Sequence, residues 1–306
     1  MKAVAVENIL IIGMSLFAAS LVPGTLTADE PATSASPTTA SSAGTRYGLF
    51  NWLDKRSGYG QDVFPTPLLV ECTDLDAGET SLDWLHTEGR GQRSDVVTTE
   101  LERAFGLLTL DLSVPYEREV SGTQVSRGIG NSDLSARYPF YQFVSGDRSI
   151  DSTLGAGVGT GIPGDSTVSN NDKFMPRAFV FDDLKIGKHF TLQSVAGCST
   201  LSGSGADSGL QTFDYGLALG CTLPHKELPL PDVQQFIPMF ELVGETQLNK
   251  ADPGHNSLLG DAGFQVGLKA IGHVEPWLRF GFVLPIDKGG REDLHWGTVT
   301  SLVFDY

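Results

Sequence analysis

The last thirteen residues of the chain, LHWGTVTSLVFDY, alternate between two kinds of side chain. On an extended strand, one face would carry large groups, from Leu294 and Trp296 to Phe304 and Tyr306. The opposite face would carry small or polar groups such as Ser301. An apolar face with aromatic residues at both ends is typical of a strand that faces lipid, and a soluble protein seldom exposes such a face to water. The pattern therefore predicts a membrane-spanning β-strand.

The same period of two recurs upstream, in segments of about ten residues, the length that a tilted strand needs to cross a bilayer. In one of them, Leu278 and Phe280 share a face while Arg279 and Gly281 lie on the other. An even number of antiparallel strands fits an up-and-down barrel whose termini share one side. Counting these segments gives about twelve strands, near residues 66–76, 93–105, 107–120, 128–142, 149–163, 174–184, 186–200, 209–224, 235–249, 256–271, 274–286 and 294–306.

Two fold classes share this alternation. A soluble β-sandwich should carry many charges on its second face, whereas here that face holds Gly, Thr, Ser and isolated charges, as expected in a narrow lumen. Lipid offers no partner to an open sheet edge, so membrane strands must close into a barrel. We therefore predict an all-β fold: a closed antiparallel up-and-down transmembrane β-barrel of about twelve strands, with a short irregular N-terminal segment.

The N-terminal quarter lacks this pattern and divides into three parts. An apolar run from Asn8 to Val22 follows Lys2, and Ala28 is a suitable cleavage point, so residues 1–28 are predicted to be a signal peptide. Residues 29–45 are rich in Ser, Thr, Ala and Pro and predict a disordered linker. Residues 46–64 hold aromatic, glycine and charged residues without a period, and we interpret them as a plug or a mouth element. Residues 65–306 would then form the barrel.

The net charge and the cysteine content argue against some classes of function. The formal net charge is −16 without basic clusters, which argues against nucleic acid as a partner. The three cysteines, Cys72, Cys198 and Cys221, have no spacing typical of a metal site, and no cofactor is predicted. Small apolar side chains are one interpretation of them, and a Cys198–Cys221 bridge across neighbouring strands is another.

Charged residues on the predicted inward faces are the main candidates for function. They could form a constriction that selects solutes, or they could pair with one another to fill a closed barrel. A second cluster is predicted from Glu100, Glu102, Asp111, Asn131, Asp133 and Arg137. The predicted lumen-lining residues of the first cluster are Glu241, Glu245, Gln247, Asp261, Gln265, Lys269, Glu275 and Arg279.

Two short motifs carry less weight. Gly159 to Gly164 matches GxGxxG, but a phosphate-binding loop needs a helix after it, and here a polar loop follows. We expect these glycines to keep the lumen open or to let another segment approach the wall closely. Gly164-Asp165-Ser166 matches the start of a hydrolase block, but no histidine lies in a recognisable block with a Ser and an Asp or Asn. Catalysis is therefore not predicted.

The chain also resembles a known family. The stretch Phe236 to Tyr306, with FELVGETQLN, SLLGDAGFQVGLKA, EPWLRFGFVLPI and REDLHWGTVTSLVFDY, is similar to the C-terminal half of transporter-type outer-membrane proteins of the meta-pathway of phenol degradation. Val114-Pro115-Tyr116, GAGVGTGIP from Gly155 to Pro163, and Leu82 to His86 fit the same pattern. The resemblance implies a barrel of about a dozen strands and uptake of aromatic compounds.

These observations predict an exported channel or transporter of the Gram-negative outer membrane for small, hydrophobic or aromatic, molecules. Its expected partners are membrane lipid, the outer-membrane assembly machinery and a small hydrophobic solute. One alternative is a non-conducting structural or surface-interaction barrel with paired lumen charges. A second is a lipid-modifying enzyme that uses Ser166.

Overall fold

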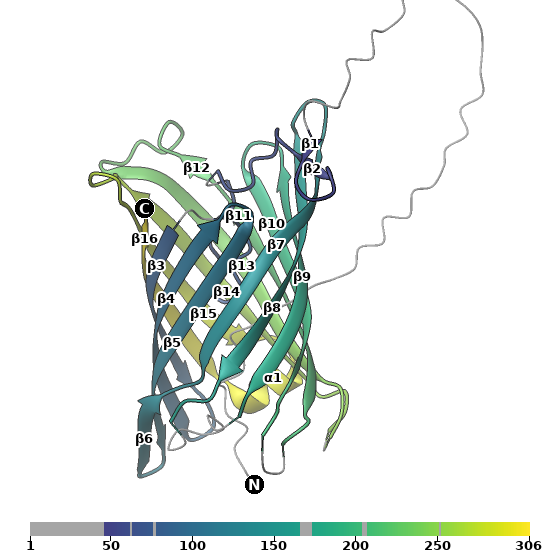
Figure 1. Ribbon diagram of the computed structural model, residues 1–306. Helices are drawn as coiled ribbons and strands as arrows, with labels where there is room; N and C mark the ends of the chain where they lie inside the picture. The colour runs from purple at the N-terminus through teal and green to yellow at the C-terminus, as the bar shows by residue number, and fades with distance from the viewer. Residues whose placement is uncertain (1–45, 62, 76–77, 166–172, 204–206, 251) are drawn as a thin grey trace, which may run out of the picture.

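Twelve antiparallel strands close into a barrel in the computed structural model (Figure 1). The structure describes residues 46–61, 63–75, 78–165, 173–203, 207–250 and 252–306, so the predicted signal peptide and linker lie outside the described residues. The barrel strands are β3 (Gly78–Glu88), β4 (Gln92–Phe105), β5 (Leu108–Ser121), β7 (Ser132–Val144), β8 (Ile150–Ile162), β9 (Met175–Ile186), β10 (Phe190–Thr200), β11 (Gln211–Cys221), β13 (Val233–Gln247), β14 (Asn256–Leu268), β15 (Glu275–Pro285) and β16 (Trp296–Asp305).

Pairing between the first and last of these strands closes the barrel. β16 pairs with β3 from Trp296↔Glu88 to Asp305↔Glu79, and every other barrel strand pairs with its neighbours in chain order. Two short strands extend this sheet: β6 (Gln124–Ile129) pairs with β5, and β12 (Leu223–Pro224) pairs with β13. The predicted all-β, closed, twelve-stranded antiparallel barrel is confirmed.

Alternation along the strands sorts side chains as the sequence predicts. On β15, Leu278, Phe280 and Phe282 are exposed on the outer surface, while Arg279 between them is only 4% exposed. Large apolar side chains are exposed in the same way on β3, β4, β5 and β8, so the barrel carries an outward apolar band. Among the described residues, no helix is long and apolar enough to span a bilayer; α1 covers only Lys288–Asp293.

The N-terminal part of the described chain lies against and inside the barrel. β1 (Arg46–Tyr47) and β2 (Leu53–Asp54) form a hairpin, and Gln142 of β7 donates its backbone N–H to Trp52 O at 3.0 Å. Residues 57–61 and 63–75, which we call the inserted segment, then enter the lumen. Tyr59, Phe64, Leu69 and Val70 of this segment share an apolar core with inward side chains of the wall.

The predicted strand near 66–76, and with it a barrel that starts at residue 65, is wrong, because the first barrel strand is Gly78–Glu88. Pro65 and Pro67 have no backbone N–H to give to a ladder. The N–H groups of the next three residues bond to a side chain rather than to a neighbouring strand. The strand count nevertheless agrees, since β3 takes the place of the misplaced strand.

Glycines on the inner wall make room for aromatic rings rather than for an open channel. A Cβ atom on Gly155 would lie 1.9 Å from the Phe181 ring, and one on Gly157 would lie 2.2 Å from the Phe179 ring. Both rings come from the neighbouring strand β9 and are buried. A wall glycine makes room for the inserted segment in the same way, because a Cβ on Gly263 would lie 2.8 Å from Leu68.

Candidate functional site

The lumen is the candidate site, and one buried carboxylate holds the inserted segment at its centre. Glu241, on the inward face of β13, accepts the backbone N–H groups of Leu68, Leu69 and Val70 at 2.7, 2.8 and 3.0 Å. Its side chain has no solvent exposure. Hydrogen bonds to a charged acceptor contribute about 1.5–3 kcal/mol each. Because these N–H groups do not bond to a neighbouring strand, a side chain of the wall supplies their hydrogen-bond acceptor.

Two neighbouring strands bind the carbonyl groups just before this point. Arg279 of β15 donates from Nη1 to Thr66 O at 3.3 Å and to Pro67 O at 3.2 Å. Gln265 of β14 also donates to Thr66 O. The guanidinium of Arg279 is held in place by Asp83 of β3, 3.2 Å away. Side chains of the barrel wall therefore bind both backbone N–H groups and backbone carbonyl groups of the inserted segment.

The opposite wall holds the second half of the segment. Arg177 of β9 donates to Glu71 Oε2 at 2.5 Å, and Thr73 Oγ1 donates to Asp183 Oδ1 at 2.5 Å. Arg137 of β7 donates to Asp74 O at 2.7 Å and also pairs with Glu102 of β4. The inserted segment is therefore tied to walls on both sides of the lumen.

Asp74, near the end of the inserted segment, is a buried acid that accepts backbone hydrogen bonds. Its Oδ1 accepts the N–H groups of Gly60 and Leu75, each at 2.8 Å, and its side chain is almost fully buried. Burial raises the pKa of Asp74 to about 6, although these backbone hydrogen bonds act in the opposite direction. The segment therefore carries a carboxyl group whose pKa lies well above that of an ordinary aspartate.

The entrance of the segment is fixed by ion pairs and short hydrogen bonds. Arg56 pairs with Asp54 at 2.6 Å, and this hydrogen-bonded pair lowers the pKa of Asp54. Asp151, at the start of β8, accepts from Ser57 Oγ at 2.8 Å and from Gly58 N at 2.6 Å. These contacts lie at the barrel end that carries the C-terminus (Figure 1).

The predicted lumen residues fall into two groups. Glu241, Asp261, Gln265 and Arg279 are buried inside the barrel. The remaining residues lie toward the strand ends: Glu245 in a small pocket of β13, Gln247 at the end of β13, Lys269 just after β14 and Glu275 at the start of β15. Lys269 and Glu275 are exposed and do not meet the inserted segment through any hydrogen bond among the described residues.

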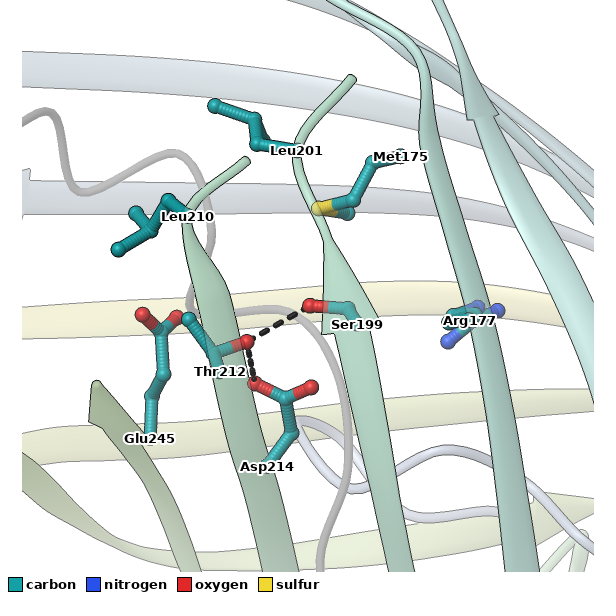
Figure 2. Close-up of a pocket in the computed structure, with 8 residues that line it drawn as sticks. All are labelled: Met175, Arg177, Ser199, Leu201, Leu210, Thr212, Asp214 and Glu245. Atoms are coloured by element: carbon teal, nitrogen blue, oxygen red, sulfur yellow. Dashed lines mark hydrogen bonds between the residues drawn. The ribbon is translucent and has the colours of Figure 1, made fainter. Parts of the chain in front are cut away.

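Figure 2 shows the small pocket, on the wall formed by β9, β10, β11 and β13. Thr212 Oγ1 donates to Asp214 Oδ1 at 2.7 Å and lies 2.7 Å from Ser199 Oγ. The space measures about 20 Å³, which suits one water molecule. With no histidine in its lining, this hydroxyl–carboxylate chain lacks the base of a Ser-type hydrolase.

A larger cavity of about 190 Å³ lies between the inserted segment and the wall formed by β16, β3, β4, β5 and β7. All six members of the second predicted cluster lie in this region. Glu100, Asp111, Asn131, Asp133 and Arg137 line the cavity, and Glu102 places a carboxylate oxygen within 4.8 Å of oxygens of Glu100 and Asp111. The sequence patterns did not predict the residues of the inserted segment that pair with the wall, chiefly Glu71. This segment has no periodic pattern, so its sequence does not indicate where it lies in the barrel.

Within the part of the chain that the structure describes, the cysteines and the two motifs form no further site. Cys198 pairs with Phe213 in the β10–β11 register, whereas Cys221 pairs with Phe190 at the other end of the same two strands. A Cys198–Cys221 bridge is therefore excluded, since the two residues are too far apart. The GxGxxG motif begins inside strand β8, as its alternation predicts. Ser166 lies outside the described residues.

No family model matches the chain, and no curated protein matches it in sequence. The chain is similar in structure to an outer-membrane channel from Pseudomonas putida F1, with a TM-score of 0.54 and 14% identity over 80% of this chain and 100% of that chain. It also matches the NanC porin (TM-score 0.46, 8% identity, 74% of this chain and 98% of that chain) and LpxR from Salmonella typhimurium (TM-score 0.43, 8% identity, 74% and 100%). The first likeness shows an outer-membrane-type β-barrel fold, and the two weaker ones add nothing to it.

Proposed function

We propose that this protein is a channel of the Gram-negative outer membrane, closed by its own inserted segment, and that small molecules pass when this segment is displaced. The observation that carries the proposal is the binding of three consecutive backbone N–H groups by Glu241 inside a barrel with an apolar outer band. The outer band supports a location in lipid. The polar lumen supports a route for solutes.

The way in which the segment is held favours a gate over a permanent core. Most of its polar partners are side chains of the wall, such as Arg177, Glu241 and Arg279, rather than a β-ladder. Such contacts can be exchanged for water one by one, so the segment can leave without breaking the barrel. Hydrophobic or aromatic solutes remain our expectation from the family resemblance, and catalysis remains unexpected.

Solute flux through the full-length protein tests this proposal. Glu241→Gln keeps the size of the side chain but removes its charge and one acceptor oxygen. Loss of a charge-assisted hydrogen bond costs about 1.5–3 kcal/mol, so we expect about a tenfold or larger rise in the open fraction. Liposome swelling with small neutral sugars measures the rise, and Glu292→Gln, at an exposed position of α1, is the matched control.

Three outcomes are distinct. Faster swelling with Glu241→Gln alone supports the gate. Impermeable liposomes with every variant, including variants that remove more of the segment's contacts, would instead favour the non-conducting structural barrel. Release of fatty acid from phospholipid vesicles would favour the lipid-modifying enzyme, for which Ser166→Ala is the decisive variant.

A further inference from the structure

The 190 Å³ cavity beside the inserted segment carries an excess of acidic groups. Three guanidinium groups reach it, and each is already in an ion pair: Arg137 with Glu102, Arg177 with Glu71 and Asp133, and Arg279 with Asp83. Among the ion pairs of the described residues, none includes Glu100 or Asp111. These two carboxyl groups hydrogen-bond to each other, and the guanidinium groups of Arg137, Arg177 and Arg279 act on them only from beyond ion-pair distance.

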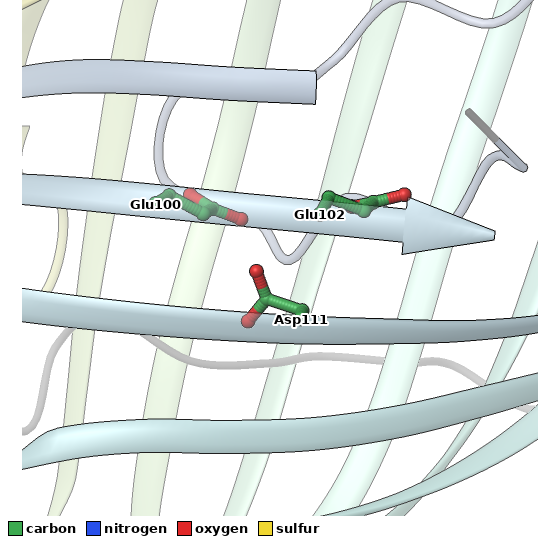
Figure 3. Close-up of side chains that lie close together, drawn as sticks. All are labelled: Glu100, Glu102 and Asp111. Carbon is green, nitrogen blue, oxygen red and sulfur yellow. The ribbon is translucent and has the colours of Figure 1, made fainter. Parts of the chain in front are cut away.

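Strand register forces acidic groups together at this place. Glu79 of β3 pairs with Glu102 of β4, and Glu102 pairs in turn with Asp111 of β5. Directly opposed like charges destabilise a sheet, so the arrangement needs compensation. Glu100, Glu102 and Asp111 each place one oxygen within 4.8 Å of the others, and Figure 3 shows them on adjacent strands.

Two buried oxygens point to a missing partner. Asp111 is only 8% exposed, and its Oδ2 has no hydrogen-bond partner among the described residues. Asp133, on the next wall strand β7, is equally buried; its Oδ1 accepts from Arg177, but its Oδ2 has no partner in the described part of the chain. Both residues line the same cavity. A buried carboxylate oxygen that lacks a donor is destabilising, so both oxygens favour a further hydrogen-bond donor in the cavity.

Another part of the same cavity wall is apolar, and the space is large enough for a ring. Leu85 of β3 pairs with Val96 of β4 and with Val299 of β16, so the three side chains form one inward row, and all three line the cavity. A cavity of about 150 Å³ lined by apolar groups holds benzene in a well-studied case. The present space is larger and ends in carboxylates.

From these features we infer that the cavity binds a small organic amine, with its ammonium group on Glu100 and Asp111 and its apolar body toward Leu85, Val96 and Val299. The inference rests on the proposed function, because it names the class of solute that the channel would take. The carboxyl pair supplies the counter-charge, and the ammonium donates up to three hydrogen bonds, one of them to Asp111 Oδ2, which has no other partner among the described residues.

Calorimetry on the detergent-solubilised full-length protein tests the inference with three probes. Benzylammonium chloride carries the ring and the charge, benzyl alcohol carries the ring alone, and calcium chloride carries the charge alone. We expect benzylammonium to bind at least tenfold more tightly than benzyl alcohol. Glu100→Gln combined with Asp111→Asn should remove this preference, whereas Glu292→Gln should keep it.

Two results would overturn the inference. Equal binding of the amine and the alcohol would mean that protons, not a cation, compensate the carboxyl groups. Calcium binding that displaces benzylammonium would make this a metal site. The comparison of probes on the unaltered protein does not depend on whether the double variant folds. Binding of the amine without any solute flux would contradict the proposed channel but support the amine site. Flux of neutral solutes without amine binding would support the channel but contradict the amine site.

Discussion

At the scale of single residues, side-chain shape as well as charge decides how the lumen is filled. Gly155 and Gly157 of β8 lie beneath the buried rings of Phe181 and Phe179. A side chain at either glycine would need the space that a ring occupies, and packed interiors tolerate such overlap poorly. These glycines are therefore part of the closed lumen, not of an open one.

Gly155→Ala should destabilise the barrel by about 1–3 kcal/mol, because the added methyl group must displace the Phe181 ring. Gly146→Ala, in the turn after β7, should be nearly neutral, since no atom lies within 4 Å of the added Cβ. Denaturant unfolding in lipid vesicles measures both free energies. Equal stabilities for the two variants would contradict the packing described here.

At the scale of elements, the inserted segment is a separate unit with its own titration. The pKa of Asp74 is raised to about 6 by burial, whereas a released segment would have an ordinary carboxyl near 3.8. A raised pKa means that docking is most favourable when Asp74 is protonated. This stabilisation is complete below about pH 4 and is lost as the pH rises through 6, by roughly 3 kcal/mol in total.

The open fraction of the channel should therefore rise between about pH 4 and pH 7, the interval that spans the two pKa values of Asp74. Asp74→Asn, which keeps the oxygen that accepts from Gly60 and Leu75, should remove most of this dependence. Conductance recorded over this pH range for both proteins provides the test. The same pH slope in the variant and the wild type would assign the dependence to another group.

At the scale of the whole molecule, the alternation of side chains along each strand creates an apolar outer surface and a polar lumen. Outward positions such as Phe280 are exposed and apolar, while the adjacent Arg279 is buried and holds the inserted segment. In lipid, charge on the outer band is costly in a way that depends on depth.

Phe280→Arg, near the middle of β15, should reduce barrel stability in vesicles by about 2–4 kcal/mol. Ile271→Arg, in the exposed connection between β14 and β15, should change it little. Unfolding of both variants from lipid vesicles compares the two positions directly. A cost at residue 280 no greater than that at residue 271 would argue against a lipid-facing band.

The barrel was predictable because lipid and lumen impose a strict period of two on residues such as Leu278 and Arg279. The inserted segment was not, because its partners lie far away in sequence: Leu68 bonds to a carboxylate 173 positions later. Strand boundaries explain the remaining errors. Lys269 continues the alternation of β14, but that strand ends at Leu268, so the side chain lies at the rim.

The proposed gate requires that the inserted segment, and not the strands, closes this barrel. The most direct measurement is the single-channel conductance, in planar bilayers, of a variant that lacks residues 46–75 beside that of the full chain. We expect a stable ohmic conductance for the truncated barrel and rare, brief openings for the full chain. A folded truncated barrel that conducts no better than the full chain would contradict the proposed gate.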